Sequence, residues 1–232
     1  FNFSRLIQEL HNFCTNELSA FYFDIRKDRL YCDRPDLFER RATRTVMAHV
    51  FECLTAWLSP YLCFTAEEAW EHRPQGVFED VDSVHLRVFP DLPESWKNDV
   101  MAQKWKKLMD VRRVVLGALE PKRAEKAIGS SLEAAPIIYV ADDAIKAAMT
   151  GVDLAELCIT SQASVKDGFG PEGIFSLPDI PGVAVEFAMA EGKKCQRCWK
   201  TLPDVGRDHD YPDLSPRDAD AVRWYMRNKK AA

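Results

Sequence analysis

The sequence of 232 residues contains no apolar run that approaches the length needed to cross a bilayer, which is about 18 residues. It also lacks a leader of the charged, then apolar, then small-residue type at its start. These absences argue against a membrane-spanning protein and against a secreted one. We therefore expect a soluble cytoplasmic protein that does not associate with membranes.

No cysteine framework of the kind that stabilises small secreted domains is present. The seven cysteines are odd in number and widely spaced, which favours a reducing cytoplasm. Only Cys195 and Cys198 have the spacing of a pair of metal ligands. The four cysteines nearest the N-terminus lie in or beside helical patterns, where we expect small buried hydrophobic residues.

The chain also lacks an excess of positive charge. Its formal net charge is -5, so binding to nucleic acid would have to rest on local basic patches. The apolar fraction of 47% fits a globular protein with an ample core. Because the chain begins at Phe1, already inside a helical pattern, we expect it to be a piece of a longer polypeptide.

Motifs of self-sufficient catalysis are missing. There is no Gly-rich phosphate loop, no nucleophile elbow and no zinc-protease helix. We also find no internal repeat and no low-complexity tract. The sequence therefore predicts no catalytic residue in this chain.

A long helix is predicted over residues 1 to about 29. Phe21, Tyr22 and Ile25 continue an apolar stripe at helical spacing, so one face should meet a core. The other face carries cations near the helix C-terminus, where they suit the helix dipole and could also contact phosphates. The cations are Arg26, Lys27 and Arg29. They are candidates for contacts with a polyanion, and the alternative is a solvated helix end.

A second helix is predicted from about residue 36 to Pro60. Arg40, Arg41 and Arg44 lie together in its N-terminal half, where the helix dipole disfavours cations. Pairing with Asp36 and Glu39 could explain them, and so could contact with phosphate groups.

Further helices and a change of texture follow. A capping box at Thr65 and Glu68 predicts a helix start. Residues 73 to 95 are predicted to form a loop that holds an extended run over 84–89. A basic helix is predicted to follow from about 98 to 119. Pro121 is expected to break or kink it. Later segments are predicted as strands at 137–140, 157–160 and 183–189, with a helix at 143–149.

The expected fold is mainly α. We predict a helical bundle over residues 1–125, a small α/β junction domain over 126–191 and a degenerate zinc-knuckle tail over 192–232.

The tail holds the one pair of cysteines with metal-ligand spacing. A zinc knuckle usually needs a second pair about 15 to 20 residues after Cys195 and Cys198, but Ser215 and Asp218 stand there. Asp218 and His209 could replace the missing thiolates. The alternatives are therefore a bound zinc ion or a metal-free remnant.

An aromatic residue stands among cations in the same turn. Trp199 could stack on an unpaired base for roughly 1 to 3 kcal/mol, with Arg197 and Lys200 holding phosphates. The alternative is that this indole covers the small core of the knuckle.

Taken together, several segments resemble the C-terminal part of bacterial isoleucyl-tRNA synthetases, which are class I aminoacyl-tRNA synthetases. FTAEEAW-like segments also occur in the related valyl, leucyl and methionyl enzymes, whereas SSLEA followed by the CxRCW knuckle narrows the resemblance to isoleucine. The segments that carry it are ELSAFYFDIRKDRLYCD at 17–33, FTAEEAW at 64–70, GSSLEA at 129–134, LCITSQASV at 157–165, and KCQRCW with DVG at 204–206.

This resemblance implies a helical bundle that grips the anticodon stem and loop, a junction domain and a zinc-binding tail. In the family, the enzyme joins isoleucine to tRNA(Ile) with ATP and Mg²⁺ for protein biosynthesis, in a catalytic domain with HIGH-like and KMSKS-like motifs. Neither motif occurs here. The resemblance thus implies a monomeric tRNA-binding fragment that depends on the rest of the synthetase for catalysis.

Two other functions are compatible with parts of the sequence. A helical scaffold without RNA binding would fit the acidic composition. A DNA-repair module would fit the knuckle, because some repair glycosylases end in a similar zinc finger, but no catalytic N-terminal amine or helix-hairpin clamp is visible.

Overall fold

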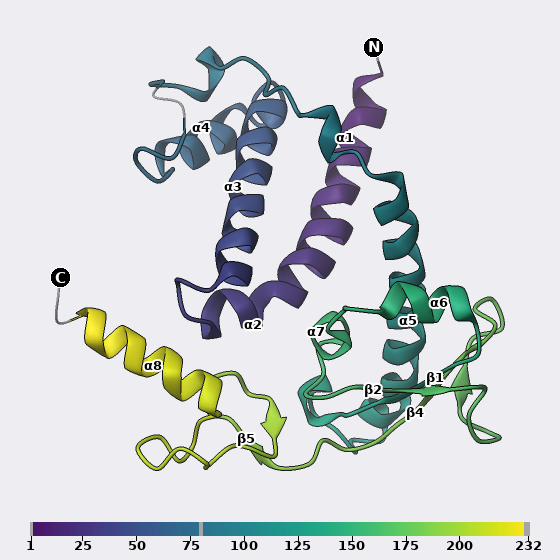
Figure 1. The fold of residues 1–232 in the computed structure, drawn as a ribbon. Helices are drawn as coiled ribbons and strands as arrows, with labels where there is room; N and C mark the ends of the chain where they lie inside the picture. The colour runs from purple at the N-terminus through teal and green to yellow at the C-terminus, as the bar shows by residue number, and fades with distance from the viewer. Residues whose placement is uncertain (1, 79–80, 230–232) are drawn as a thin grey trace. The chain divides into compact units, whose positions relative to one another are not determined.

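The computed structural model describes residues 2–78 and 81–229. The chain divides into two compact units (Figure 1). One unit is Pro35–Asn98, and the other combines the residues up to Arg34 with those from Asp99 onward. The domain boundaries predicted at 125/126 and 191/192 stay a prediction. They were drawn from changes in the sequence pattern, whereas the two units are defined by packing contacts.

The unit that holds the N-terminus begins with one continuous helical segment. It consists of α1 (Phe3–Asn12), the π-helical η1 (Phe13–Phe23) and α2 (Asp24–Cys32). Asn2 caps it, because its Oδ1 accepts a hydrogen bond from the Arg5 N–H at 3.0 Å. The helix predicted over residues 1 to 29 is confirmed for the part that the structure describes.

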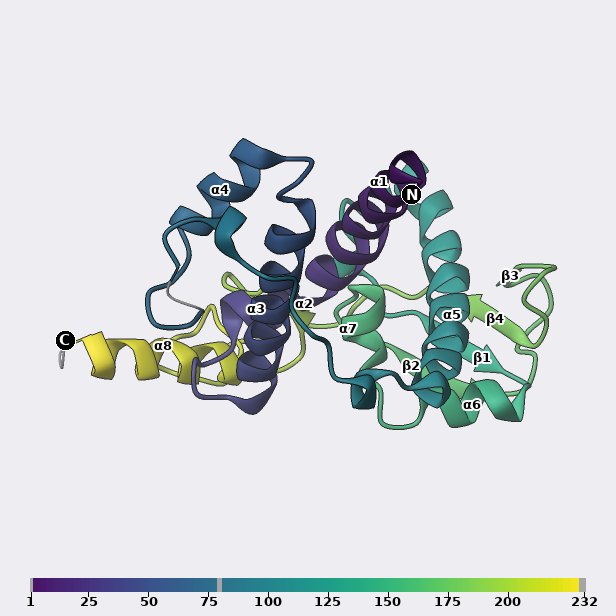
Figure 2. The same ribbon diagram turned by 90° about the horizontal axis from the view of Figure 1, so that it is seen from above.

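A four-stranded sheet forms the centre of the same unit, in the order β2-β1-β4-β3. The strands are β1 (Ile137–Val140), β2 (Ser164–Asp167), β3 (Phe175–Ser176) and β4 (Val183–Glu186). β1 pairs with β2 in parallel and with β4 antiparallel, so Ile138 lies between Val165 and Val185. Figure 2 shows α5 (Asp99–Ala124) and α6 (Asp143–Met149) alongside this sheet.

The main core lies where α5 meets the sheet. Leu108, Val111 and Leu119 of α5 are fully buried, as are Ile138 and Val140 of β1. This apolar face follows the helical spacing of the sequence, and its burial is the main stabilising contribution to the unit.

Two predictions about α5 and its surroundings need correction. Pro121 does not end the helix, which continues to Ala124, since a proline in the last turn costs few backbone hydrogen bonds. The strand predicted over 157–160 is wrong, because α7 covers Leu154–Cys158. Asp153 caps α7 by accepting from the Glu156 N–H at 3.0 Å, a local bond that outweighs the β-branched composition of the segment.

The helix predicted over 143–149 is confirmed as α6. The strand predicted over 137–140 is also confirmed, and the one over 183–189 is confirmed as far as Glu186.

The unit Pro35–Asn98 is built around one tryptophan. It contains α3 (Phe38–Leu58), α4 (Cys63–Glu71) and the short 3-10 turns η2 (Val84–Leu86) and η3 (Glu94–Trp96). Trp70 is fully buried, its Nε1 donates to the Val81 carbonyl at 3.1 Å, and Phe51 packs beside it. The motif FTAEEAW therefore supplies two buried residues of this core, Ala66 and Trp70.

Two predictions in this unit were wrong. The α4 helix begins at Cys63 with Leu62 as its N-cap, so Thr65 lies inside the first turn instead of capping it. The first part of the extended run at 84–89 is the turn η2, because the Glu67 carboxylate accepts from the Val84 N–H at 2.8 Å and bends the chain there.

The tail is a small hairpin followed by a helix. Its elements are β5 (Lys193–Lys194), β6 (Thr201–Leu202) and α8 (Pro216–Lys229), and the turn η4 (Ser131–Glu133) lies earlier in the chain. None of the helices described has the length and apolar character that crossing a bilayer requires. The mainly α fold with a small α/β part is confirmed.

Candidate functional site

The Cys195–Cys198 turn is set by its backbone. Cys195 N–H donates to the Lys200 carbonyl at 2.8 Å, and Trp199 N–H donates to the Cys195 carbonyl at 2.9 Å. Trp199 takes a left-handed conformation (φ 64°) that closes this knuckle. Gly192 has to be glycine, because a Cβ there would lie 2.1 Å from the Leu202 carbonyl oxygen.

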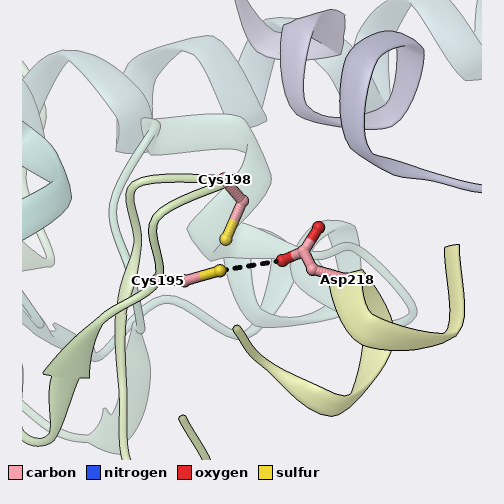
Figure 3. A group of neighbouring side chains, drawn as sticks. All are labelled: Cys195, Cys198 and Asp218. Atoms are coloured by element: carbon pink, nitrogen blue, oxygen red, sulfur yellow. Dashed lines mark hydrogen bonds between the residues drawn. The ribbon is translucent and has the colours of Figure 1, made fainter. Parts of the chain in front are cut away.

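Three groups capable of binding a metal meet behind this turn (Figure 3). The sulfur atoms of Cys195 and Cys198 and a carboxylate oxygen of Asp218 all lie within 4.8 Å of one another, and all three residues are buried. Cys195 Sγ lies 3.2 Å from Asp218 Oδ2. A hydrogen bond with Cys198 lowers the pKa of the Cys195 thiol to about 6, and the same contact raises the pKa of Cys198.

The segment Ser215 to Asp218 is the start of α8. Ser215 Oγ accepts from the Asp218 N–H at 3.2 Å and donates to Asp218 Oδ2 at 2.8 Å. With Pro216 at the first helical position, this arrangement is a helix N-cap with an acidic third residue. The two positions where a second cysteine pair was expected therefore cap a helix.

These residues do not complete a structural zinc site. Two thiols and one carboxylate, which are common zinc ligands, come together here. The group that stands in place of a fourth ligand is the neutral hydroxyl of Ser215, which is outside the usual set of Cys, His, Asp and Glu. In addition, Arg217 Nη2 stands 3.3 Å from both oxygens of Asp218. His209 is exposed and is not part of the cluster found among the described residues. Zinc is thus doubtful in this chain.

Arg217 ties the tail to α2. Its Nη1 and Nη2 donate to the two oxygens of Asp28 at 2.6 and 2.9 Å. Lys200 Nζ lies 3.3 Å from the same carboxylate. Burial would raise the pKa of Asp28, but the hydrogen bond and charge of Arg217, aided by Lys200, lower it to about 2. Sequence reasoning missed Asp28 and Arg217, although the Ser-Pro-x-Asp capping pattern could have placed Arg217 in the first turn of a helix.

Two of the predicted RNA-contacting arginines join α2 to α7. Glu156 accepts from Arg26 Nη1 at 2.8 Å and from Arg29 Nε at 3.3 Å. Arg29 also lies 3.4 Å from the buried Asp33. The structure thus brings these two cations together around a carboxylate that the sequence did not single out.

Arg197 is another predicted contact with internal partners. Its Nη2 donates to the Tyr31 carbonyl at 2.8 Å, and its backbone carbonyl accepts from the Cys32 thiol at 3.8 Å. The end of α2 therefore holds the knuckle turn in place.

The remaining predicted contacts are more accessible. Trp199 is 63% exposed, and Lys27 is exposed while paired with Asp24 at 2.7 Å. In the other unit, the first of the three α3 arginines is half-buried and the next two are exposed: Arg40, Arg41 and Arg44.

An open cavity of about 330 Å³ lies between α2, α7 and the knuckle turn. Its apolar lining includes Ile25 of α2 and Ile159, which directly follows α7. Two strongly exposed aromatic residues, Tyr31 and Trp199, also line it. The cations at this cavity come from both sides: Lys27, Arg197 and Lys200.

A family model described as the anticodon-binding domain of tRNA ligases matches residues 1–139. The chain belongs to this family. A second model, described as a zinc finger found in FPG and IleRS, matches residues 192–221. The first match includes α2 and the second includes the knuckle, which form two of the three walls of the cavity, whereas α7 lies between the matched segments.

Curated relatives carry the name isoleucine–tRNA ligase. The chain is 52% identical over 223 residues to the one from Agrobacterium fabrum, covering 96% of this chain and 23% of the relative. It is 51% identical over 224 residues to the one from Brucella abortus, covering 96% and 22%. The one from Caulobacter vibrioides is 48% identical over 225 residues, covering 97% and 23%. The chain thus spans under a quarter of the length of these relatives.

Proposed function

We propose that this chain binds the anticodon region of a tRNA, with the cavity between α2 and the knuckle as the site that receives an unpaired base. The observation that carries the proposal is the exposed indole of Trp199 at the rim of an apolar cavity with Lys27 beside it. Sequence-specific RNA recognition uses unpaired bases that stack on aromatic side chains, with cations at the phosphates.

The ion pairs of α2 give its arginines a positioning role. Arg26 and Arg29 fix α7 against α2 through Glu156, which supports a role in positioning the α7 wall of the cavity. Lys200 is similarly committed to Asp28. Lys27 and the exposed Arg41 and Arg44 are then the better candidates for phosphate contacts, where each neutralised phosphate adds salt dependence to binding.

The chain would serve a longer enzyme. The matches to isoleucine–tRNA ligases favour an isoleucine–tRNA ligase as the whole protein. The proposal includes tRNA(Ile) as its partner, a monomeric state and a cytoplasmic location. Binding of ATP and Mg²⁺ and the ligation itself would belong to the part of the polypeptide outside this chain, which carries no catalytic motif. Family membership speaks against the DNA-repair alternative, since the larger match is to a tRNA ligase domain.

The proposal is tested by substituting the exposed indole. Trp199→Ala should weaken binding of a tRNA(Ile) transcript by roughly 5- to 100-fold, the loss expected for one stacked base. Fluorescence anisotropy at fixed salt measures this, and thermal unfolding shows that the variant remains folded.

Trp96→Ala is the matched control, because Trp96 is also exposed (56%) but belongs to the unit Pro35–Asn98 and is not one of the residues that line the cavity. It should bind tRNA within about twofold of the wild type. Equal affinities for both variants would remove the cavity from the RNA interface. If the wild-type chain binds no more tRNA than a neutral control protein does, the result would favour the helical scaffold without RNA binding.

A further inference from the structure

We infer that the tail of this chain is built without a metal ion, and that a cluster of ion pairs centred on Arg217 holds it together in place of zinc. The inference concerns the structure of the tail and stands whether or not the cavity binds RNA. It departs from the zinc finger that the family match to residues 192–221 implies.

The first argument is that the donors in the second half of the knuckle already have other roles. Asp218 Oδ2 accepts from Ser215 Oγ at 2.8 Å, while Ser215 Oγ in turn accepts from the Asp218 N–H. A carboxylate in the first turn of a helix also meets the positive end of the helix dipole. A metal ion at Asp218 would have to compete with bonds that define the start of α8.

The second argument is charge balance. Three carboxylates lie around the base of α8, and four cations meet them, of which Arg29 is shared with Glu156. Arg217 grips Asp28 through two hydrogen bonds and lies 3.5 Å from Asp33 Oδ1. The charged groups of this cluster are Asp28, Asp33 and Asp218 with Arg29, Arg197, Arg217 and Lys200.

Because the cluster is balanced by its own side chains, it does not need an added divalent cation. The two-pronged contact of Arg217 with Asp28 is the strongest geometry available to an arginine and a carboxylate. The guanidinium group of Arg217 also lies beside the Asp218 carboxylate. Its positive charge therefore interacts with the carboxylate that a metal ion would have to bind.

The third argument is that the same contacts join the pieces that a metal ion would join. In a zinc knuckle the ion connects the first pair of ligands to the second. Here Ser215 N–H lies 3.4 Å from Cys195 Sγ, and Gln196 N–H donates to the Asp213 carbonyl at 3.0 Å, so both halves are already connected. Arg217 then anchors the second half to α2 through Asp28.

The test begins with the purified wild-type chain, kept reduced. Metal analysis by mass spectrometry should find no stoichiometric zinc, and a strong chelator should leave protease resistance of residues 192–229 unchanged. About one zinc ion per chain, together with faster cleavage of the tail after chelation, would overturn the inference.

Arg217→Met removes the centre of the cluster. Cleavage within the tail should become faster by about tenfold or more, because the buried partner carboxylates lose the one cation that they share and the link between α8 and α2. Arg227→Met is the matched control on the exposed part of α8 and should behave as the wild type. Equal cleavage of both variants would show that Arg217 does not hold the tail.

A gain-of-metal variant keeps the test independent of a folding failure. The double substitution Ser215→Cys and Asp218→Cys supplies the four thiolates of a closed zinc site and should take up about one zinc ion per chain. Uptake by this variant and not by the wild type supports the inference. Equal uptake by both would contradict it.

Discussion

Asp28 shows how one side chain can decide whether a surface segment stays attached. It lies on α2 and accepts from Arg217 of α8, 189 residues later. Burial of this carboxylate favours its neutral form, but Arg217 and Lys200 outweigh burial and lower its pKa from 3.8 to about 2. A group whose pKa is lower in the folded state stabilises the protein above its unfolded pKa.

The pH dependence of an Asp28→Asn variant should follow from this shift. Near neutral pH the variant should lose about 2 kcal/mol of the free energy of unfolding of the tail. The difference between variant and wild type should shrink as the pH falls below about 4 and vanish near about 2, where Asp28 itself becomes protonated.

Hydrogen exchange of the α8 amides at increasing denaturant concentration gives the free energy of unfolding of the tail, and comparing variant with wild type gives this difference. Asp91→Asn, at an exposed position, serves as the control. If the difference in unfolding free energy between variant and wild type stays constant to within about 0.5 kcal/mol between pH 6 and pH 3, Asp28 does not carry the charge interaction.

At the scale of elements, the unit Pro35–Asn98 depends on one short helix. Trp70 of α4 is enclosed by two guanidinium groups, Arg73 at 4.2 Å and Arg87 at 4.1 Å from the ring centroid. Cation–π contacts and apolar burial therefore act on the same side chain.

Replacing this tryptophan should unfold the unit selectively. Trp70→Ala should cost about 3 to 5 kcal/mol, because it leaves a large cavity and two arginines without their aromatic partner. Phe64→Ala changes an aromatic residue that is 91% exposed in the same helix and should be nearly neutral. Thermal unfolding with both variants tests this, and similar melting temperatures would show that Trp70 is not the core of the unit.

How far the elements could be predicted depends on how local their causes are. The apolar stripe through Phe21 and Ile25 predicts the first helix, because helical periodicity can be recognised within a short stretch of sequence. The segment around Leu157 was misread, since β-branched residues after it favour a strand and the decisive cap, Asp153, is a weak signal. The partnership of Arg26 with Glu156 spans 130 residues and leaves no pattern in the sequence.

The candidate site shows the same division. The Cys195–Cys198 turn and the exposed Trp199 follow from a motif. The capping role of Ser215 and Asp218 was readable from Ser-Pro-x-Asp, but the expectation of a second cysteine pair hid it. The cavity could not be predicted, because its walls come from three separate segments.

At the scale of the whole molecule, α2 organises the unit that contains the tail. Its ion pairs lead to α7 through Glu156 and to α8 through Arg217, and its last turn binds Arg197 of the knuckle. Because the net charge is -5, the proposed RNA binding would have to rest on local groups around the cavity and not on the field of the whole chain.

The central claim is that an unpaired base of a tRNA enters the cavity beside Trp199. The most direct measurement is ultraviolet crosslinking of the chain to tRNA(Ile), with mass spectrometry of the joined peptides and nucleotides. The account predicts adducts on Trp199 or Tyr31 with anticodon-loop nucleotides, suppressed by excess unlabelled tRNA. Specific crosslinks confined to other surfaces, with none at the cavity, would contradict it.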